Sequence, residues 1–353
     1  MVAVGSGGVA TLTLTGTGTF QTSGSLNNVS TSTTGLSMTV NNGALLLMDK
    51  TSSSSVHSLL NLTVNTGGTA RVTGTGGYQM GNPADGLVTL GGGTLDLSGS
   101  SENVFSLTFN SGTLQNSSVN PATLTMASTF NLHGAACKFD VASGSSLFIP
   151  NAISGIGSLI LNDSGTLTLG GINTYSGSTT VNSGTLDVNA TGSISTNVVT
   201  VNAGTLEMDN TAAMASAATL NVAAAGATVN LNYGGTQTIN ALYVGGVQQA
   251  PGIYGASPAY NPSSVFTGSG TITISSGPPV TIATSTISGD QLNICWNSVN
   301  GGNYNVFTTT SLNPPVTWTP VNANPIPATA STTCYTLPGS VSGQPQLYVT
   351  VMQ

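Results

Sequence analysis

The feature that most constrains this chain is a recurring unit in which Gly and Thr precede alternating apolar residues. Clear copies of the unit begin at Gly93, Gly112, Gly165, Gly184, Gly204 and Gly270, and looser copies begin at Gly43 and Gly68. Successive side chains of a strand point to opposite faces, so each copy places its apolar residues on one face and Thr, Asp or Ser on the other. One such strand cannot bury its apolar face alone, and the copies are therefore expected to stack on one another.

The spacing of the copies predicts how they stack. The copies that begin at Gly165, Gly184 and Gly204 follow one another at nearly equal steps. Each step corresponds to roughly one solenoid coil. We predict an all-β fold in which residues 1–276 form a right-handed parallel β-solenoid of about 14 coils with roughly 20 residues each. The predicted repeat core consists of Leu95, Leu97, Leu167, Leu169, Leu186, Val188 and Leu206.

The alternative for this region is a row of β-sandwiches, which also produces short alternating strands at regular intervals. Sandwich domains usually carry a core Trp, and the two Trp residues of this chain, Trp296 and Trp318, both lie near its C-terminal end. Their position favours the solenoid.

Composition limits the function classes. Charged residues make up 4% of the 353 residues and the net charge is −7, with Lys50, Arg71 and Lys138 as the only basic residues apart from two His. Because a phosphate-tracking surface needs clustered Lys and Arg, we expect no nucleic-acid partner. No apolar stretch approaches about 18 residues, so we expect no membrane insertion as a helix. The Thr, Ser, Asn and Gly content favours an extracellular protein whose export signal is not in this chain.

The C-terminal quarter has a different composition. Residues 277–280 contain Gly-Pro-Pro, which cannot continue a strand ladder, and we predict a linker there. Short alternating strands follow, so residues 281–353 are expected to form a small antiparallel β-sandwich. Cys295 and Cys334 lie on strands of this domain and could form a disulfide if those strands are neighbours, or remain free. Cys137 is expected to be a small buried hydrophobic residue.

One segment carries a family resemblance. Residues 173–181 read Asn-Thr-Tyr-Ser-Gly-Ser-Thr-Thr-Val and are followed by Gly184-Thr185-Leu186. This pattern closely resembles the autotransporter-associated β-strand repeat over positions 157–188, and weaker relatives of the unit cover most of positions 1–276. The resemblance implies an exported bacterial passenger-type β-helix at the cell surface. The C-terminal sandwich is similar to modules of large secreted bacterial proteins.

The sequence offers little catalytic chemistry. Asp96, Asp187 and Glu207 each follow the Leu of a Gly-Thr-Leu unit, so we expect them on one solvated outer face. Asp49 and Lys50 are expected to form a surface ion pair of little energetic value. No nucleophile motif or phosphate-binding loop is present, and we therefore expect no enzyme activity, no catalytic residue, no metal site and no cofactor.

Two functional interpretations remain. Strand pattern begins almost at once in this chain, and Val9, Thr11, Leu12 and Leu14 would form an unpaired edge of the first coil. We expect this edge to dock against the C-terminal region of another copy and to produce a head-to-tail structural filament. The alternative is an adhesin-like surface shaft that binds glycans or other cells.

Overall fold

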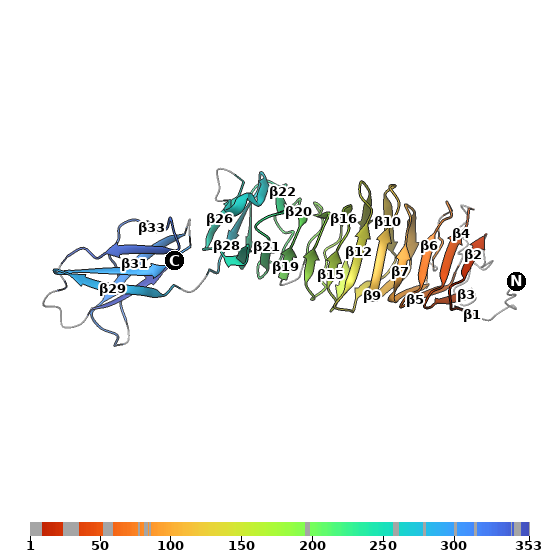
Figure 1. Cartoon of the computed structure of the whole chain (residues 1–353), viewed down its shortest axis with the longest axis horizontal. Coiled ribbons are helices and arrows are strands. Elements are labelled where there is room, and N and C mark those ends of the chain that lie inside the picture. Colours follow the sequence, from red (N-terminus) through yellow and green to blue (C-terminus); the bar gives the residue numbers. More distant parts are fainter. Residues whose placement is uncertain are drawn as a thin grey trace.

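The computed structural model is an elongated all-β molecule with a solenoid shaft and a smaller domain beyond the C-terminal end of the shaft (Figure 1). Apart from one short 3-10 helix, η1 (Pro262–Ser264), its regular elements are strands. The structure describes the chain outside residues 1–8, 24–34, 52–58, 77, 81–83, 85, 195–197, 257–260, 278–279, 300–301, 314–315, 340, 342–346 and 353. Statements below concern those described residues.

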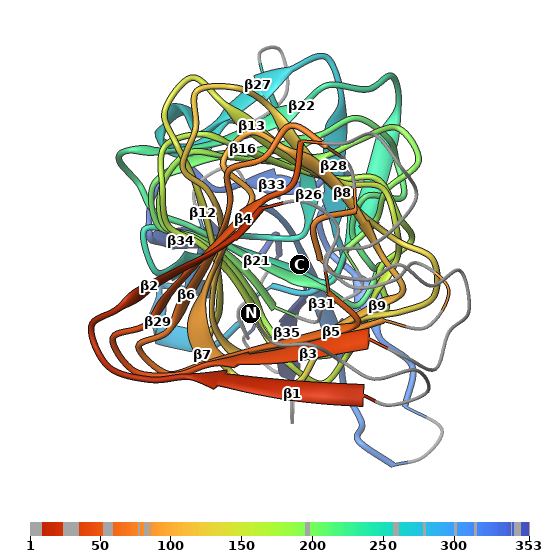
Figure 2. The same cartoon turned by 90° about the vertical axis from the view of Figure 1, so that its right-hand side faces the viewer.

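The shaft is a parallel β-solenoid with three stacks of strands, which wind around a common interior (Figure 2). The first stack contains β1 (Val9–Leu14), β3 (Gly35–Val40), β5 (Asn61–Asn65), the first halves of β7 (Leu87–Asp96) and β9 (Ser106–Asn116), β11 (Phe130–Leu132) and β14 (Ile153–Gly155). The second stack contains β2 (Thr19–Ser23), β4 (Leu45–Asp49), β6 (Thr69–Val72), the second halves of β7 and β9, β12 (Cys137–Val141), β15 (Leu159–Leu161), β17 (Thr179–Val181), β19 (Val198–Val201), β21 (Thr219–Val222) and β24 (Ala241–Val244). The third stack contains β8 (Ser101–Val104), β10 (Ala122–Met126), β13 (Ser146–Ile149), β16 (Thr166–Leu169), β18 (Thr185–Val188), β20 (Gly204–Met208), β22 (Ala227–Leu231) and β27 (Phe266–Gly268).

Glycines form corners where neighbouring coils approach closely. Gly112 sits inside β9, between the halves that belong to different stacks, with φ +103°. A Cβ at this position would lie 2.2 Å from the carbonyl oxygen of Gly93 in the adjacent coil. Only a residue without a side chain tolerates both the positive φ and the contact, so the repeated Gly of the sequence unit has a structural cause.

The interior of the shaft is a set of apolar columns that run along its axis. All seven residues of the predicted repeat core are fully buried. One column of the second stack has its members in register on successive coils, namely Phe20, Leu46, Ala70, Leu95, Leu114, Phe139, Leu161, Val181, Val201, Val222 and Val244. Burial of such columns is the main favourable term in the stability of the shaft.

The predicted number of about 14 coils was wrong, because many coils are longer than the repeat unit suggests. The register partners Arg71 and Asp96 on adjacent coils have a sequence separation of 25, whereas Asn182 and Asn202 have a separation of 20. The last part of the region 1–276 adds no further parallel coil to the second stack. It forms β25 (Val247–Gln248) and a small sheet of β23 (Thr236–Ile239), β26 (Gly252–Gly255) and β28 (Thr271–Ile274).

The C-terminal domain consists of antiparallel sheets, consistent with a small sandwich. One sheet contains β29 (Ile282–Ser288), β30 (Gln291–Asn297) and β34 (Thr332–Thr336). The other strands are β31 (Asn303–Thr309), β32 (Thr319–Pro320), β33 (Ile326–Pro327) and β35 (Tyr348–Met352). Trp296 and Tyr304 pack in its core with ring centroids 5.8 Å apart. Of the predicted linker 277–280, Pro278 and Pro279 lie outside the described residues.

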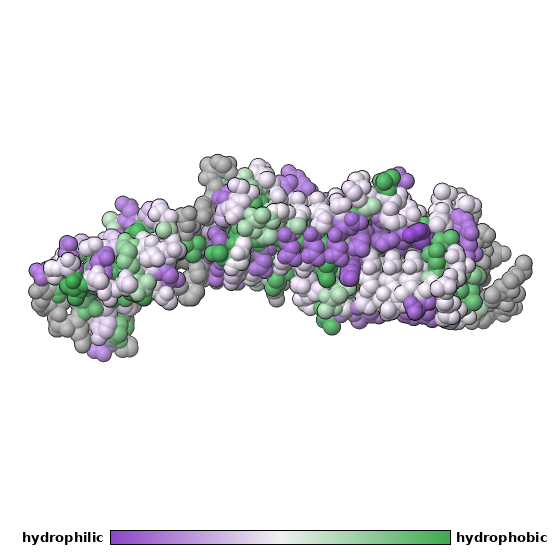
Figure 3. Space-filling view, in the orientation of Figure 1, coloured by the Kyte–Doolittle hydropathy of each residue, from purple (hydrophilic) through white to green (hydrophobic). Residues whose placement is uncertain are grey.

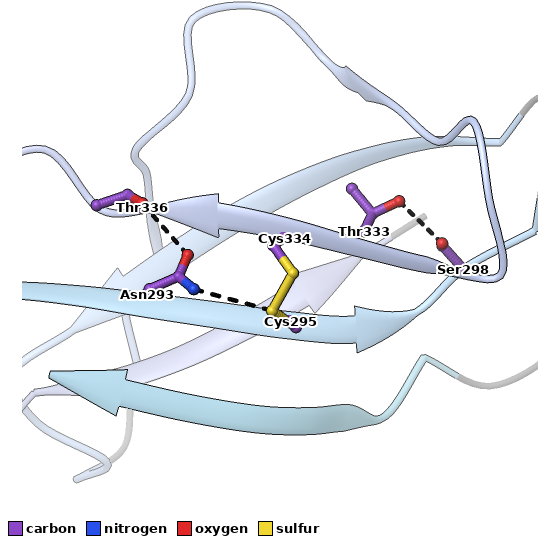
Figure 4. The surroundings of a disulfide bond; sticks show 6 residues. All are labelled: Asn293, Cys295, Ser298, Thr333, Cys334 and Thr336. Atoms are coloured by element: carbon purple, nitrogen blue, oxygen red, sulfur yellow. Dashed lines mark hydrogen bonds between the residues drawn. A yellow bond between two sulfur atoms is a disulfide. The ribbon is translucent and has the colours of Figure 1, made fainter. Parts of the chain in front are cut away.

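Cys295 and Cys334 form a disulfide between β30 and β34 (Figure 4). The two residues lie directly opposite each other in the antiparallel register, with their Cα atoms 4.0 Å apart. Ile294 and Trp296 point into the core on either side of Cys295, so the disulfide lies on the other face of the sheet. Cys137 is a free cysteine buried in the shaft.

Candidate functional site

The predicted assembly edge lies at the N-terminal end of the shaft, which faces the viewer in Figure 2. Within the part of the chain that the structure describes, β1 pairs only with β3 and β2 pairs only with β4. Leu12 and Leu14 are half-buried against the apolar core, and Thr11 is exposed on the outer face. The side chain of Val9 lies outside the described residues. One edge of each strand therefore presents backbone donors and acceptors without a strand partner among the described residues.

The other end of the second stack is covered. β24 pairs with β21 on one side and with the antiparallel strand β25 on the other. Gly245 and Gly246 join β24 to β25 with φ values of +59° and +79°, as a two-residue hairpin requires. The short β25 therefore ends the parallel ladder of this stack at β24, and the two ends of the second stack differ.

A second open edge lies in the C-terminal domain. β29 is the outer strand of its sheet and pairs only with β30 among the described residues. The whole of β29 is exposed, and Ile282 and Ile287 retain 43% and 67% of their accessible surface. The strand contains no charged residue and no Pro, which are the usual protections of an edge strand.

The prediction that Asp96, Asp187 and Glu207 share a solvated face was wrong for Asp96. Asp96 is in the second stack, whereas the other two are in the third, on β18 and β20. The Asp96 side chain is buried, and its Oδ2 accepts hydrogen bonds from Arg71 Nε at 2.8 Å and Ser117 Oγ at 2.7 Å. The hydrogen bonds from Ser117, Gln115 and Arg71 outweigh burial and lower the pKa of Asp96. Asp96 is therefore the buried partner of Arg71 in a structural ion pair.

Asp187 and Glu207 are register neighbours on adjacent coils of the outer surface. Burial raises the pKa of both carboxyl groups, and the charges of their acidic neighbours raise them further. Thr168 Oγ1 donates to Asp187 at 3.0 Å, and Asn230 Nδ2 donates to Glu207 at 3.2 Å. No group of three or more His, Cys, Asp or Glu residues that could hold a metal ion occurs in the described parts of the chain.

The expected surface ion pair of Asp49 and Lys50 was also wrong, because Lys50 is buried. Its Nζ lies 5.9 Å from the centroid of the Tyr78 ring. Gln79 and Glu102 are buried beside it: Gln79 Nε2 donates to the Lys50 carbonyl oxygen at 2.6 Å, and the Gln79 backbone N–H donates to Glu102 Oε2 at 2.8 Å.

We call Lys50, Gln79 and Glu102 the buried polar cluster. The two contacts that build it join residues with sequence separations of 29 and 23, which only the stacking of coils brings together. No local pattern in the sequence signals the cluster, so sequence reasoning missed it.

The outer surface of the shaft carries polar side chains in ladders, and Figure 3 shows a hydrophilic band along one face. The clearest ladder consists of asparagines. Asn182 Nδ2 donates to Asn162 Oδ1 and Asn202 Nδ2 donates to Asn182 Oδ1, both at 2.8 Å. Uncharged amides thus replace surface charge as the polar coat of the solenoid, as the composition predicts.

One segment of the shaft matches a known family. Residues 157–188 match the family model described as the passenger-associated-transport-repeat. This segment contains β15, β16, β17 and β18, within the parallel ladders described above. The shaft therefore carries, on at least one stretch of its coils, a repeat of the kind described for transported passenger proteins. The predicted resemblance is thereby confirmed for the segment on which it was based.

No curated protein and no solved structure matched the chain. Among the described residues, none of the helices has the length and apolarity to cross a membrane. The passenger-type repeat implies a secreted or cell-surface protein.

Proposed function

We propose that this passenger-type β-helix is the subunit of an extracellular structural fibre that assembles head-to-tail. The observation that carries the proposal is the position of two of the open strand edges: β1 and β2 at the N-terminal end of the shaft, and β29 in the C-terminal domain. The C-terminal end of the second stack is covered by β25. The N-terminal edge of one copy therefore pairs with β29 of the next copy, by strand addition.

The two edges suit each other chemically. The strands β1 and β29 are of similar length, and neither contains a charged residue. Edge pairing satisfies backbone groups on both strands, and the exposed Ile287 gains an apolar contact. Because the edges lie on different parts of the molecule, the contact is heterologous and generates an open filament when its rotation does not close. The low charge of the chain keeps repulsion between subunits small.

Negative-stain electron microscopy with sedimentation over a concentration series tests this proposal. We expect filaments whose mean length grows with protein concentration. Ile287→Lys places a charge on the edge strand and should shorten the filaments and raise the concentration needed for assembly about tenfold or more. Ile156→Lys is the matched control, because Ile156 is 75% exposed but lies on the shaft, away from both edges.

A variant of the N-terminal edge distinguishes pairing between β1 and β29 from other forms of association. Thr13→Lys changes an exposed residue of β1 and should weaken assembly as Ile287→Lys does. A mixture of the two variants still contains one intact edge of each kind, so it should form dimers and no long filaments. Monodisperse rods of the wild type at high concentration, or filaments unaffected by both substitutions, would contradict the proposal.

A further inference from the structure

The asparagine ladder ends at a particular coil. Asn162, Asn182 and Asn202 each follow the core residue of the second-stack column on successive coils. In the next two coils the corresponding residues are Ala223 and Gly245, which follow Val222 and Val244. Asn202 donates to the rung before it, but there is no amide in the next coil to donate to its Oδ1. The ladder therefore ends with an exposed acceptor.

A pocket of about 320 Å³ lies where the missing rungs would be. Part of its lining consists of small residues, Ala223, Ala224, Gly245 and Gly246. The polar lining comes from three successive coils, with Thr200 on β19, Asn221 on β21 and Tyr243 on β24 in register with one another. The pocket forms because Ala223 and Gly245 are smaller than the asparagines at the corresponding positions of the preceding coils. It lies beside the outward-facing side chains of Thr200, Asn221 and Tyr243.

The lining groups have free hydrogen-bonding capacity. Among the described residues, the side chains of Asn221 and Tyr243 have no hydrogen-bond partner, and Asn202 uses only one Nδ2 hydrogen. The pocket is lined by no charged side chain. It offers two amides, two hydroxyls and a half-buried aromatic ring that would all face one ligand.

We infer that this pocket is a binding subsite for a neutral saccharide. A sugar ring presents an apolar C–H face that can lie against Tyr243, and hydroxyl groups that can both donate to Asn202 Oδ1 and bond to Asn221 and Thr200. An anionic or cationic ligand would find no opposite charge in the lining. The inference is independent of the fibre, because none of these residues belongs to β1, β2 or β29.

The ligand occupies the position that the next asparagine of the ladder would fill. Restoring that asparagine should therefore block binding. Ala223→Asn adds the next amide of the ladder at a position where the preceding coils already accept asparagine, so the variant should fold with an unchanged or higher melting temperature. The new side chain fills the pocket, and its Nδ2 donates a hydrogen bond to Asn202 Oδ1. We expect it to weaken saccharide binding at least about tenfold, and Tyr243→Ala to do the same by removing the ring.

Isothermal titration and NMR of the full chain with chitotetraose and cellotetraose, and with tetragalacturonate as the charged counterpart, measure the effect. Saturable binding of a neutral tetrasaccharide, absent for tetragalacturonate and lost in Ala223→Asn, is the expected result. Asn162→Ala is the control, because it removes an amide at the opposite end of the same ladder and should leave binding unchanged. Absence of binding for both neutral probes, or binding that survives Ala223→Asn and Tyr243→Ala, would overturn the assignment.

Discussion

Several of the few charged side chains of this protein are buried in the shaft domain. Lys50, Asp96 and Glu102 are buried, although charged residues make up only 4% of the chain. Asp96 is compensated by Arg71 and by hydroxyl and backbone donors. Glu102 is less well compensated, since its Oε1 has no hydrogen-bond partner among the described residues. Removing a carboxylate from water without full compensation disfavours its charged form.

This imbalance predicts a pH dependence of stability. Burial raises the pKa of Glu102 from 4.5 to about 8, against the opposing effects of the Gln79 backbone and of Lys50. Between these two values the folded state holds a proton that the unfolded state has released. The free energy of unfolding should therefore fall as pH rises through this range, by up to about 1.4 kcal/mol per pH unit. Glu102→Gln should remove this contribution.

Urea unfolding at intervals from pH 5 to pH 9 measures the slope. The wild type should lose stability relative to Glu102→Gln as pH increases, so the variant is the more stable protein at pH 9. Asp163→Asn, at an exposed acidic residue, serves as a control that should retain the slope. Parallel curves for the wild type and Glu102→Gln would show that Glu102 does not titrate in this range.

Sequence alternation predicted the buried residues but not the partners of the polar ones. Leu167 and Leu169 are assigned to the interior by period two alone. The neighbours of Asp96 and Glu102 depend on the coil length, because partners at sequence separations of 25 and 23 lie beside them only in the register of the longer coils. The copies of the Gly-Thr-Leu unit after Gly165 repeat at a shorter interval than these separations. If that shorter interval is applied to the N-terminal coils, it pairs the wrong side chains on adjacent coils.

At the scale of elements, the two parts of the molecule are stabilised differently. The inner strands of the shaft are held by the coils on both sides, whereas β30 and β34 are held additionally by the Cys295–Cys334 disulfide. The sequence left the pairing of these cysteines open, because it depends on which strands are adjacent. β30 and β34 are neighbours although the sequence separation of the two cysteines is 39.

Removing this disulfide should destabilise the C-terminal domain and spare the shaft. Closing a loop of that length restricts the unfolded chain by roughly 4 kcal/mol, so Cys295→Ala with Cys334→Ala should lower the unfolding temperature of this domain markedly. Both Trp residues lie there, so Trp fluorescence reports on this domain, and far-UV circular dichroism is dominated by the shaft. A wild-type sample with reductant should behave as the double variant does. An equal shift in both signals would contradict independent unfolding.

At the scale of the whole molecule, the shaft is nearly one-dimensional, because each coil contacts mainly the coils beside it. Deleting residues 159–178 removes one full coil, since Leu159 and Thr179 are register partners. We expect this variant to fold and to be shorter by about 4.8 Å, one strand spacing. Deleting only residues 159–168 removes half a coil and should prevent folding of the shaft. Circular dichroism and small-angle X-ray scattering distinguish the outcomes.

The direction of the ladder hydrogen bonds has a mechanical consequence. In a parallel β-helix these bonds point along the long axis, so tension between the two ends of the shaft loads the coils in series. The weakest coil yields first, and each one that opens releases a slack segment of up to roughly 70 to 90 Å of chain. Stretched from its ends, the shaft would extend in steps and absorb work at each one, while the crosslink in the terminal domain limits how far that domain can be drawn out.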